Sequence, residues 1–350
     1  MNKLFLIGNG FDLAHGLKTK YSDFILWYLN QTITKAGKSA SFEDKLIKIT
    51  AGRYFNFNRF SSINELLSTA KANGISITFK HVFFRSIIEQ TTEFNWVDIE
   101  SKYYSNIIFI YRKLEKLERD NHKSIDKDLI ELNDCFDFLK ELLIEYLLTI
   151  KIEPKDKKDE IMNHFITELT TRKQKTVKDR VLFLNFNYTS TIEQYSSLPS
   201  SVSSEINYIH GKLNDSDNPI IFGYGDEMDL YYEKIERLNT NEFLRNFKSF
   251  SYFKTKNYQN LTSFIESESF NVFIMGHSCG LSDRILLNSI FEHINCKKIK
   301  IYYFQKSESE NDFFEKTQEI SRHFKSNSKN KMRNSIIPFS ECLPLIKTNS

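Results

Sequence analysis

One stretch near the start of the chain decides the fold: Lys3-Leu4-Phe5-Leu6-Ile7-Gly8-Asn9-Gly10-Phe11-Asp12. A short continuous apolar run closed by glycines predicts a β-strand buried on both faces, as in a parallel sheet. A helical pattern follows from Leu13 to Tyr28. We therefore predict that the chain begins with a βα unit.

Apolar runs of the same kind return after residue 180. They occupy residues 181–184, 206–209, 220–222, 272–275 and 299–304. Helical patterns lie between them, for example over residues 285–294. Strands that alternate with helices predict a doubly wound α/β fold with a parallel sheet.

The residues between these two regions have a different pattern. Apolar residues recur at spacings of three and four over residues 96–117 and again over 129–146, which predicts two amphipathic helices. The polar link at 120–124 favours an antiparallel pair, and residues 42–49 and 82–87 resemble shorter helices. We predict one domain made of residues 1–30 and 180–350, interrupted by a helical insertion over 31–179.

Composition excludes several classes of protein. The 350 residues carry a net charge of only +3, so no charge excess calls for nucleic acid or a membrane surface. Aromatic residues make up 14% of the chain, which argues against disorder. The four cysteines form no Cys-x-x-Cys pair, so we expect no zinc site and a reducing compartment. Without a signal peptide or a membrane-spanning run, a cytoplasmic protein is expected.

Glycine and polar residues follow the apolar runs at the points where the strands should end. They are Gly8, Asn9 and Gly10, then Asn185 and Asn187, His210, Gly223, and finally Gly276, His277 and Ser278. In an open parallel sheet, ligands bind outside the carboxyl ends of the strands, and glycines let the backbone approach them closely. The pattern predicts a nucleotide-sized pocket; the alternative is that these residues only make turns.

Other motifs leave alternatives open. The glycine loop has Leu13 where a dinucleotide fingerprint has its third glycine, and the chain has no P-loop motif. Residues 276–280 match a Gly-x-Ser-x-Gly nucleophile elbow, which Asp312 and His323 would complete as a hydrolase triad. Residues 322–333 are basic, and they are either a nucleic-acid contact or a solvated charge run.

Several blocks together resemble the bacteriophage abortive-infection AbiH family. The segment LIGNGFDLAHGLKTKYSDF at residues 6–24 is similar to the opening signature of that family. Further blocks fit it in the same order: 96–100, 183–189, 209–211, 221–227, and 276–278 with Asp283. The resemblance implies an antiphage defence protein that responds to a phage-derived trigger, and we expect it to form a homo-oligomer.

The order of blocks also resembles, more distantly, sirtuin-like NAD-consuming domains. That resemblance implies a Rossmann-like (sirtuin-like) fold in which Gly8 and Gly10 contact the diphosphate, Gly276 and Ser278 lie on the adenosine side, and Asn187 and His210 are catalytic. The sequence departs from sirtuins at Phe186 and Thr189 and lacks the four-cysteine zinc module. We therefore expect cleavage of NAD by water rather than deacetylation, and we expect no metal cofactor.

These residue types fit such a reaction. An amide such as Asn187 orients water and ribose hydroxyls without adding a charge, and a histidine such as His210 accepts a proton near neutral pH. Asp12 and Asp283 are expected to bind ribose hydroxyls or to balance positive charge. The complete predicted nucleotide-binding set is Gly8, Asn9, Gly10, Asp12, Asn185, Gly223, Gly276, His277, Ser278 and Asp283. The alternative function is a non-hydrolytic sensor of nucleotides or nucleic acid.

Overall fold

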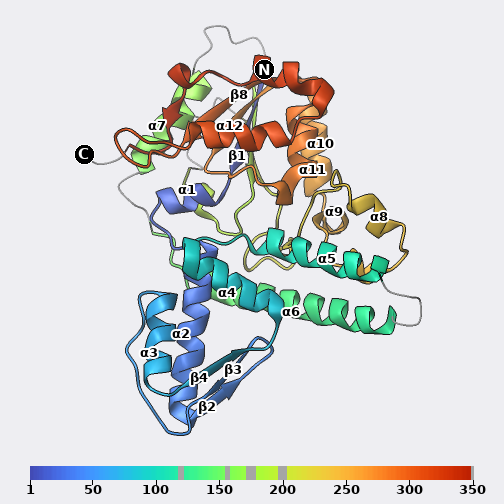
Figure 1. Cartoon of the computed structure of the whole chain (residues 1–350). Helices are drawn as coiled ribbons and strands as arrows, with labels where there is room; N and C mark the ends of the chain where they lie inside the picture. Colours follow the sequence, from blue (N-terminus) through green and yellow to red (C-terminus); the bar gives the residue numbers. More distant parts are fainter. Residues whose placement is uncertain (117–121, 154–157, 171–178, 196–202, 348–350) are drawn as a thin grey trace. The chain divides into compact units, whose positions relative to one another are not determined.

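The computed structural model describes residues 1–116, 122–153, 158–170, 179–195 and 203–347 (Figure 1). The chain forms two compact units. Unit 1 comprises Met1–Lys18, Lys151–Asp229 and Phe247–Ser350, and unit 2 comprises Thr19–Ile150 and Leu230–Asn246. The domain boundaries expected after residues 30 and 179 stay a prediction.

Unit 1 contains a six-stranded sheet in which every pair of neighbouring strands is parallel. Across the sheet the strands are β6 (Ser203–Tyr208), β5 (Arg180–Asn185), β1 (Asn2–Ile7), β7 (Phe270–Met275), β8 (Cys296–Tyr303) and β9 (Leu343–Pro344). Numbered within the sheet in chain order, they read 3-2-1-4-5-6. The predicted α/β fold with a parallel sheet is confirmed.

Strand β1 is central and contributes to a core on each face of the sheet. Because successive side chains of a strand point to opposite faces, Leu4 and Leu6 belong to one buried cluster and Phe5 and Ile7 to the other. The Phe5 ring lies 5.2 Å from that of Phe165 on α7 (Lys158–Thr170). Burial on both faces explains why the run reads as continuously apolar.

Shorter helices complete unit 1. Helix α1 follows β1, and the remaining helices flank the strands that come after residue 247 (Figure 1). Their bounds are α1 (Asn9–Ala14), α9 (Lys248–Ser251), α10 (Asn257–Ser267), α11 (Arg284–Phe291), α12 (Phe313–Arg322) and α13 (Lys329–Ser335).

The strand expected at residues 220–222 is absent. Those residues are irregular, with one backbone hydrogen bond from Ile221 to His210 and an isolated bridge between Tyr224 and Phe247. Their side chains are buried, which explains the apolar pattern, but a strand also needs a continuous hydrogen-bonded neighbour. Strand β9 was not expected, because two residues ending in Pro344 carry no strand pattern.

Unit 2 combines helices with a small antiparallel sheet. Its helices are α2 (Tyr21–Ser39), α3 (Ile63–Ala72), α4 (Val82–Phe94), α5 (Ile99–Lys116), α6 (His122–Leu148) and α8 (Tyr232–Glu236). Helices α5 and α6 form the predicted pair (Figure 1). The shorter helix predicted at residues 82–87 is confirmed as part of α4. Of the polar link expected at 120–124, residues 120 and 121 lie outside the described part of the chain, and α6 begins at His122.

The prediction of a helix at residues 42–49 is wrong. The sheet of unit 2 consists of β2 (Ser41–Glu43), β3 (Ile47–Thr50) and β4 (Ser76–Phe79). Along β3, buried and exposed side chains alternate, beginning with buried Ile47 and exposed Lys48. This two-residue period belongs to a strand, so the insertion is not purely helical.

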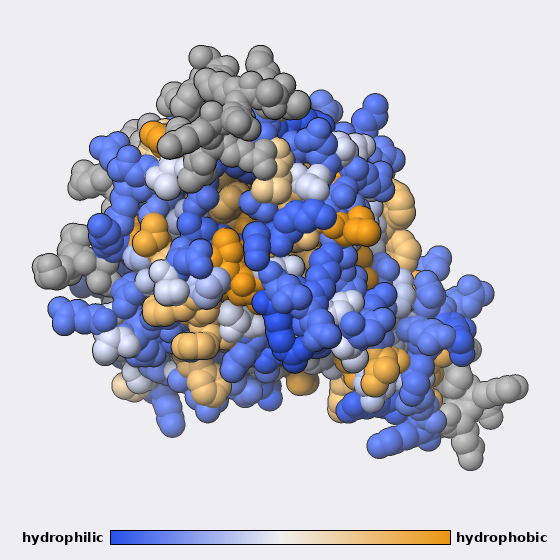
Figure 2. Space-filling view, turned by 90° about the horizontal axis from the view of Figure 1, so that it is seen from above, coloured by the Kyte–Doolittle hydropathy of each residue, from blue (hydrophilic) through white to orange (hydrophobic). Residues whose placement is uncertain are grey.

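On the face in Figure 2, hydrophilic residues dominate and hydrophobic residues form small separate patches. Among the described helices, none combines the length and the apolar character needed to span a bilayer.

Candidate functional site

The glycine loops after β1 and β7 meet backbone to backbone. The N–H of Gly10 donates to the carbonyl oxygen of Gly276 at 2.8 Å. Gly276 has a φ of +76°, and a Cβ built on it would lie 2.1 Å from the backbone nitrogen of Phe11. In this structure, the absence of side chains at these glycines allows the two loops to contact each other closely. Their contact with a diphosphate stays a prediction.

Two asparagines fix the loop that follows β5. The Asn185 amide donates to the carbonyl oxygens of Asn187 and Thr189, at 3.1 and 3.2 Å. The Asn187 amide donates across the loops to the carbonyl oxygen of Gly8 at 3.0 Å. Asn185 therefore stabilises its own turn, whereas Asn187 connects the loops after two neighbouring strands.

Asp12 is a buried carboxyl group on α1, directly behind the glycine loop. The hydroxyl of Thr189 donates to its Oδ2 at 2.6 Å, and its Oδ1 has no hydrogen-bond partner among the described residues. Burial raises the pKa of Asp12 to about 6, against hydrogen bonds that lower it. Asp12 can therefore gain or lose a proton close to neutral pH.

Asp283 is the centre of a second buried cluster. Its Oδ1 lies 3.2 Å from Nε2 of His210 and 2.8 Å from Nζ of Lys248. Its Oδ2 lies 3.5 Å from Nε2 of His277. The chain brings these groups from the ends of β6 and β7, the start of α9 and the residue before α11. Three of the four were predicted site residues.

Lys248 was missed by the sequence analysis. It is 1% exposed and forms the buried ion pair with Asp283. The only local signal is a lysine among aromatic residues, in the segment Phe247-Lys248-Ser249-Phe250. That pattern also describes an ordinary surface lysine, so only the fold identifies its partner.

The electrostatics of the cluster keep both histidines neutral at pH 7. Burial lowers the pKa of His210, Lys248 lowers it further, and the opposing effect of Asp283 is smaller. Burial also lowers the pKa of His277, although Asp283 opposes the shift. Burial alone would raise the pKa of Asp283, but Lys248 and the imidazoles hold it well below its ordinary value.

The two imidazoles have different environments. Nδ1 of His277 accepts a hydrogen bond from the backbone N–H of Cys279 at 2.9 Å, so the ring hydrogen lies on Nε2, towards Asp283. His210 presents Nε2 to Asp283 and, at 3.3 Å, to the hydroxyl of Tyr252. A hydrogen on Nε2 leaves Nδ1 of His210 as a proton acceptor.

Phe186 connects the two clusters. It precedes Asn187 in the chain, and its ring centroid lies 5.2 Å from that of His210 and 4.0 Å from that of His277. Asn187 and His210 are only 8% and 4% exposed. The ring next to Asn187 in the chain therefore packs against both imidazoles, and the two predicted catalytic residues have little access from solvent.

The remaining predicted residues lie around this core. Asn9 is exposed at the start of α1, Ser278 is exposed on the loop after β7, and Gly223 belongs to the irregular segment after residue 219. In the part of the chain that the structure covers, no group of three or more histidine, cysteine or acidic side chains is arranged to hold a metal ion.

The triad alternative is not assembled. Nε2 of His323 lies 2.8 Å from the carbonyl oxygen of Cys279, and the carboxylate of Asp312 accepts from the backbone N–H of Phe304 at 2.6 Å. These contacts occupy the base and the acid that Ser278 would need.

Several lysines and arginines of the basic segment at 322–333 have partners within the chain. Lys329 contacts the hydroxyl of Ser321, and Arg322 pairs with Glu319. These contacts give part of the segment a structural role.

Comparison with known families gives one match. The family model described as "Bacteriophage abortive infection AbiH" matches residues 4–305. No curated protein matches the chain. The matched region includes both glycine loops, the asparagine loop and all four members of the Asp283 cluster.

Proposed function

Because the chain belongs to the bacteriophage abortive infection AbiH family, we propose that it defends against phage by cleaving the N-glycosidic bond of NAD⁺. Membership of this family indicates abortive-infection defence. The NAD⁺ reaction is the finer part of the proposal. It rests on one observation: the neutral imidazole of His210, paired with Asp283 at 3.2 Å, lies beside the loop that carries Asn187.

The position in the sheet supports a nucleotide ligand. Strand order 3-2-1-4-5-6 is that of Rossmann-like folds, whose ligands bind at the carboxyl ends of the strands where the order reverses. Here the order reverses between β1 and β7, whose ends carry Gly8 and Gly276. In this proposal the diphosphate occupies that edge, and Asp12 faces the ribose.

The residues present suit the chemistry. The nicotinamide ring of NAD⁺ is already cationic, so it leaves as a neutral molecule when the bond to C1′ of the ribose breaks. Water forms the new bond to C1′ and transfers its proton to His210, and the products are ADP-ribose and nicotinamide. Asn187 orients the water, and Asp283 stabilises the imidazolium that forms.

The burial of the site fits an enzyme that is held inactive. Asn187 and His210 are 8% and 4% exposed, which leaves a dinucleotide little access to them in this form. Continuous cleavage of NAD⁺ would harm an uninfected cell, so a closed resting form is what such a defence protein requires.

The test compares wild type with Asn187→Ala and His210→Ala. Cells that express each protein are infected, and NAD⁺, nicotinamide and ADP-ribose are measured by chromatography alongside plaque formation. We expect wild type to lose NAD⁺ after infection and both variants to retain it and lose protection. His293→Ala, a half-buried histidine outside the cluster, is the matched control. Protection by wild type without loss of NAD⁺ would rule out the reaction.

A second candidate is a nucleotide sensor that does not hydrolyse its ligand. It is favoured by the Asn187 amide, which is already bonded to Gly8, and by Thr189, where sirtuins have an aspartate. Calorimetry of the purified protein with NAD⁺ and ADP-ribose distinguishes the two. Stable binding of NAD⁺ without release of nicotinamide, also in extracts of infected cells, would favour the sensor.

A further inference from the structure

Residues 230–246 leave unit 1 and belong to unit 2. The chain passes into unit 2 after Asp229 and returns at Phe247. An ion pair near each end of this excursion joins the chain to residue 283 or residue 284 of unit 1. Asp226 pairs with Arg284 at 3.0 Å, and Lys248 pairs with Asp283 at 2.8 Å. The excursion therefore ends at the buried cluster and begins at an ion pair with the residue next to Asp283.

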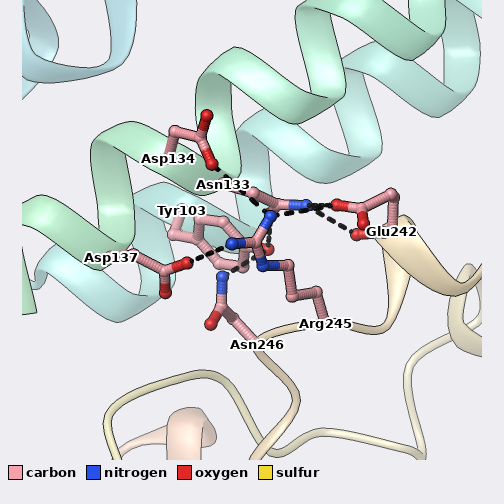
Figure 3. Close-up of polar contacts among 7 residues, drawn as sticks. All are labelled: Tyr103, Asn133, Asp134, Asp137, Glu242, Arg245 and Asn246. Carbon is pink, nitrogen blue, oxygen red and sulfur yellow. Dashed lines mark hydrogen bonds and ion pairs between the residues drawn. The ribbon is translucent and has the colours of Figure 1, made fainter.

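Arg245, close to the end of the excursion, anchors it on α6, as Figure 3 shows. Its guanidinium lies 2.8 Å from Asp137 and 3.5 Å from Asp134, both on α6, and 3.3 Å from Glu242 of the excursion itself. Burial opposes the charge of Arg245, but these carboxylates raise its pKa. One cation thus joins the excursion to the longest helix of unit 2.

A neutral network supports the same anchor (Figure 3). The amide of Asn133 donates to the backbone carbonyl oxygen of Glu242 at 2.8 Å, and the hydroxyl of Tyr103 donates to Asn133 at 2.6 Å. Asn246 donates to the hydroxyl of Tyr103 at 3.4 Å. Tyr103 and Asn133 are fully buried, so these bonds hold the excursion to both α5 and α6.

The connection from this anchor to the cluster is short. Lys248 follows Arg245 by three positions, which span at most about 11 Å of extended chain. Within it Phe247 is buried, and the backbone N–H of Lys248 donates to the carbonyl oxygen of Tyr224 at 3.0 Å. Lys248 is thus joined to the anchor by a short length of chain that is held at both ends.

We propose that Lys248 is a positioning residue of the site and that the Arg245 anchor sets its place, so that changes in unit 2 reach Asp283 and His210 through residues 245–248. Withdrawal of Lys248 leaves the carboxylate of Asp283 facing the two imidazoles without its cation. The pKa values of both imidazoles then rise, because the cation that lowers them has gone. The catalytic meaning of this coupling rests on the proposed function, but the coupling itself is measurable without substrate.

The groups that face the two imidazoles decide what a titration reports. They are Asp283 and Lys248 for both rings, Tyr252 and His277 for His210, and Lys316 and His323 for His277. Of the charged groups among them, Lys248 alone lies in the segment 245–248. A change in unit 2 that moves this segment therefore alters both imidazole titrations in the same direction.

The experiment uses the full chain and two matched arginine variants. Arg245→Gln removes the anchor, whereas Arg237→Gln removes an exposed ion pair with Glu233 in the same excursion. The imidazole titrations of His210 and His277 are followed by NMR with labelled histidine. Because loss of the anchor should let Lys248 move away from Asp283, both pKa values should rise by about half a unit or more in Arg245→Gln. Arg237→Gln should match wild type.

Lys248→Met shows how far the two histidine pKa values shift when the cation itself is removed, and it serves as the reference for Arg245→Gln. It should raise both pKa values by about one unit or more; no change would overturn the positioning role. Identical titrations of Arg245→Gln and Arg237→Gln would overturn the coupling, and this comparison suffices if Lys248→Met does not fold. If the variants show these shifts but wild-type protein does not cleave NAD⁺ even after infection, the proposed function is refuted and the coupling stands.

Discussion

The side-chain amide of Asn187 donates a hydrogen bond to the backbone carbonyl oxygen of Gly8, although 179 positions separate the two residues in the chain. The bond joins the loops after β5 and β1, which are neighbours in the sheet. The proposed catalytic amide is therefore also a structural link, and each role makes a measurable prediction.

Replacing Asn187 by alanine should reduce stability as well as activity. A buried carbonyl oxygen that loses one of its donors costs about 1–2 kcal/mol of unfolding free energy. Chemical denaturation measures the loss. Asn330→Ala, which removes an exposed hydrogen bond in the same unit, should change stability by less than about 0.5 kcal/mol. Equal losses in both variants would contradict the structural role of the amide.

Gly276→Ala should be much more damaging than a glycine substitution in open space. Its Cβ would lie 2.1 Å from the backbone of Phe11, at a φ of +76°. Gly74 has a φ of +70° with nothing within 4 Å. Strain of φ alone costs about 1 kcal/mol, so thermal denaturation should show a small loss for Gly74→Ala and loss of the folded unit 1 for Gly276→Ala. A folded Gly276→Ala protein of wild-type stability would contradict the close contact of the loops.

Asp12→Asn should change how stability depends on pH. Because the pKa of Asp12 is raised from 3.8 to about 6, the folded protein binds this proton more tightly than the unfolded chain. The carboxyl group therefore lowers stability as pH rises from about 4 to 6, by roughly 2–3 kcal/mol in total.

Denaturation of wild type and Asp12→Asn at pH 4 and pH 8 isolates this effect, because contributions from the histidines cancel in the comparison. The variant should gain roughly 2 kcal/mol relative to wild type between the two pH values. A constant difference between the two proteins would show that Asp12 has an ordinary pKa.

Lys248 and Asp283 should behave as a coupled pair. Removing either partner leaves the other charge buried alone, at a cost of about 3–5 kcal/mol. The double variant Lys248→Met/Asp283→Asn removes both charges and should be far less destabilised than the sum of the single variants. A double-mutant cycle by chemical denaturation measures the coupling. Strictly additive losses would mean that the two side chains do not form the pair.

The pH profile of NAD⁺ cleavage should reflect His210. A base must be neutral, and the pKa of His210 lies below the ordinary 6.5, so the acid limb of kcat/KM should fall below pH 6.5. Asp12 titrates in a similar range, and Asp12→Asn should leave the limb in place if His210 is the base. An acid limb above pH 7 would exclude the buried histidine from this role.

Much of the site was predictable from chain position alone. Asn187, His210 and His277 follow apolar runs, and the carboxyl ends of parallel strands lie at one edge of a sheet. The segment at 220–222 shows the limit of this reasoning. Its side chains are buried like those of a strand, but none of the described strands forms a ladder of hydrogen bonds with it. An apolar sequence pattern indicates that side chains are buried, and it does not show whether the backbone pairs with another strand.

The sequence by itself determined the parallel α/β core, because side chains buried on both faces leave a continuous apolar run such as Leu4 to Ile7. It also determined which loops carry amide and imidazole groups. Only the tertiary structure decided that Asp283 shares its carboxylate between His210, His277 and Lys248. Such a pairing depends on contacts between residues far apart in the chain, and no local pattern distinguishes a buried lysine with a partner from one in solvent.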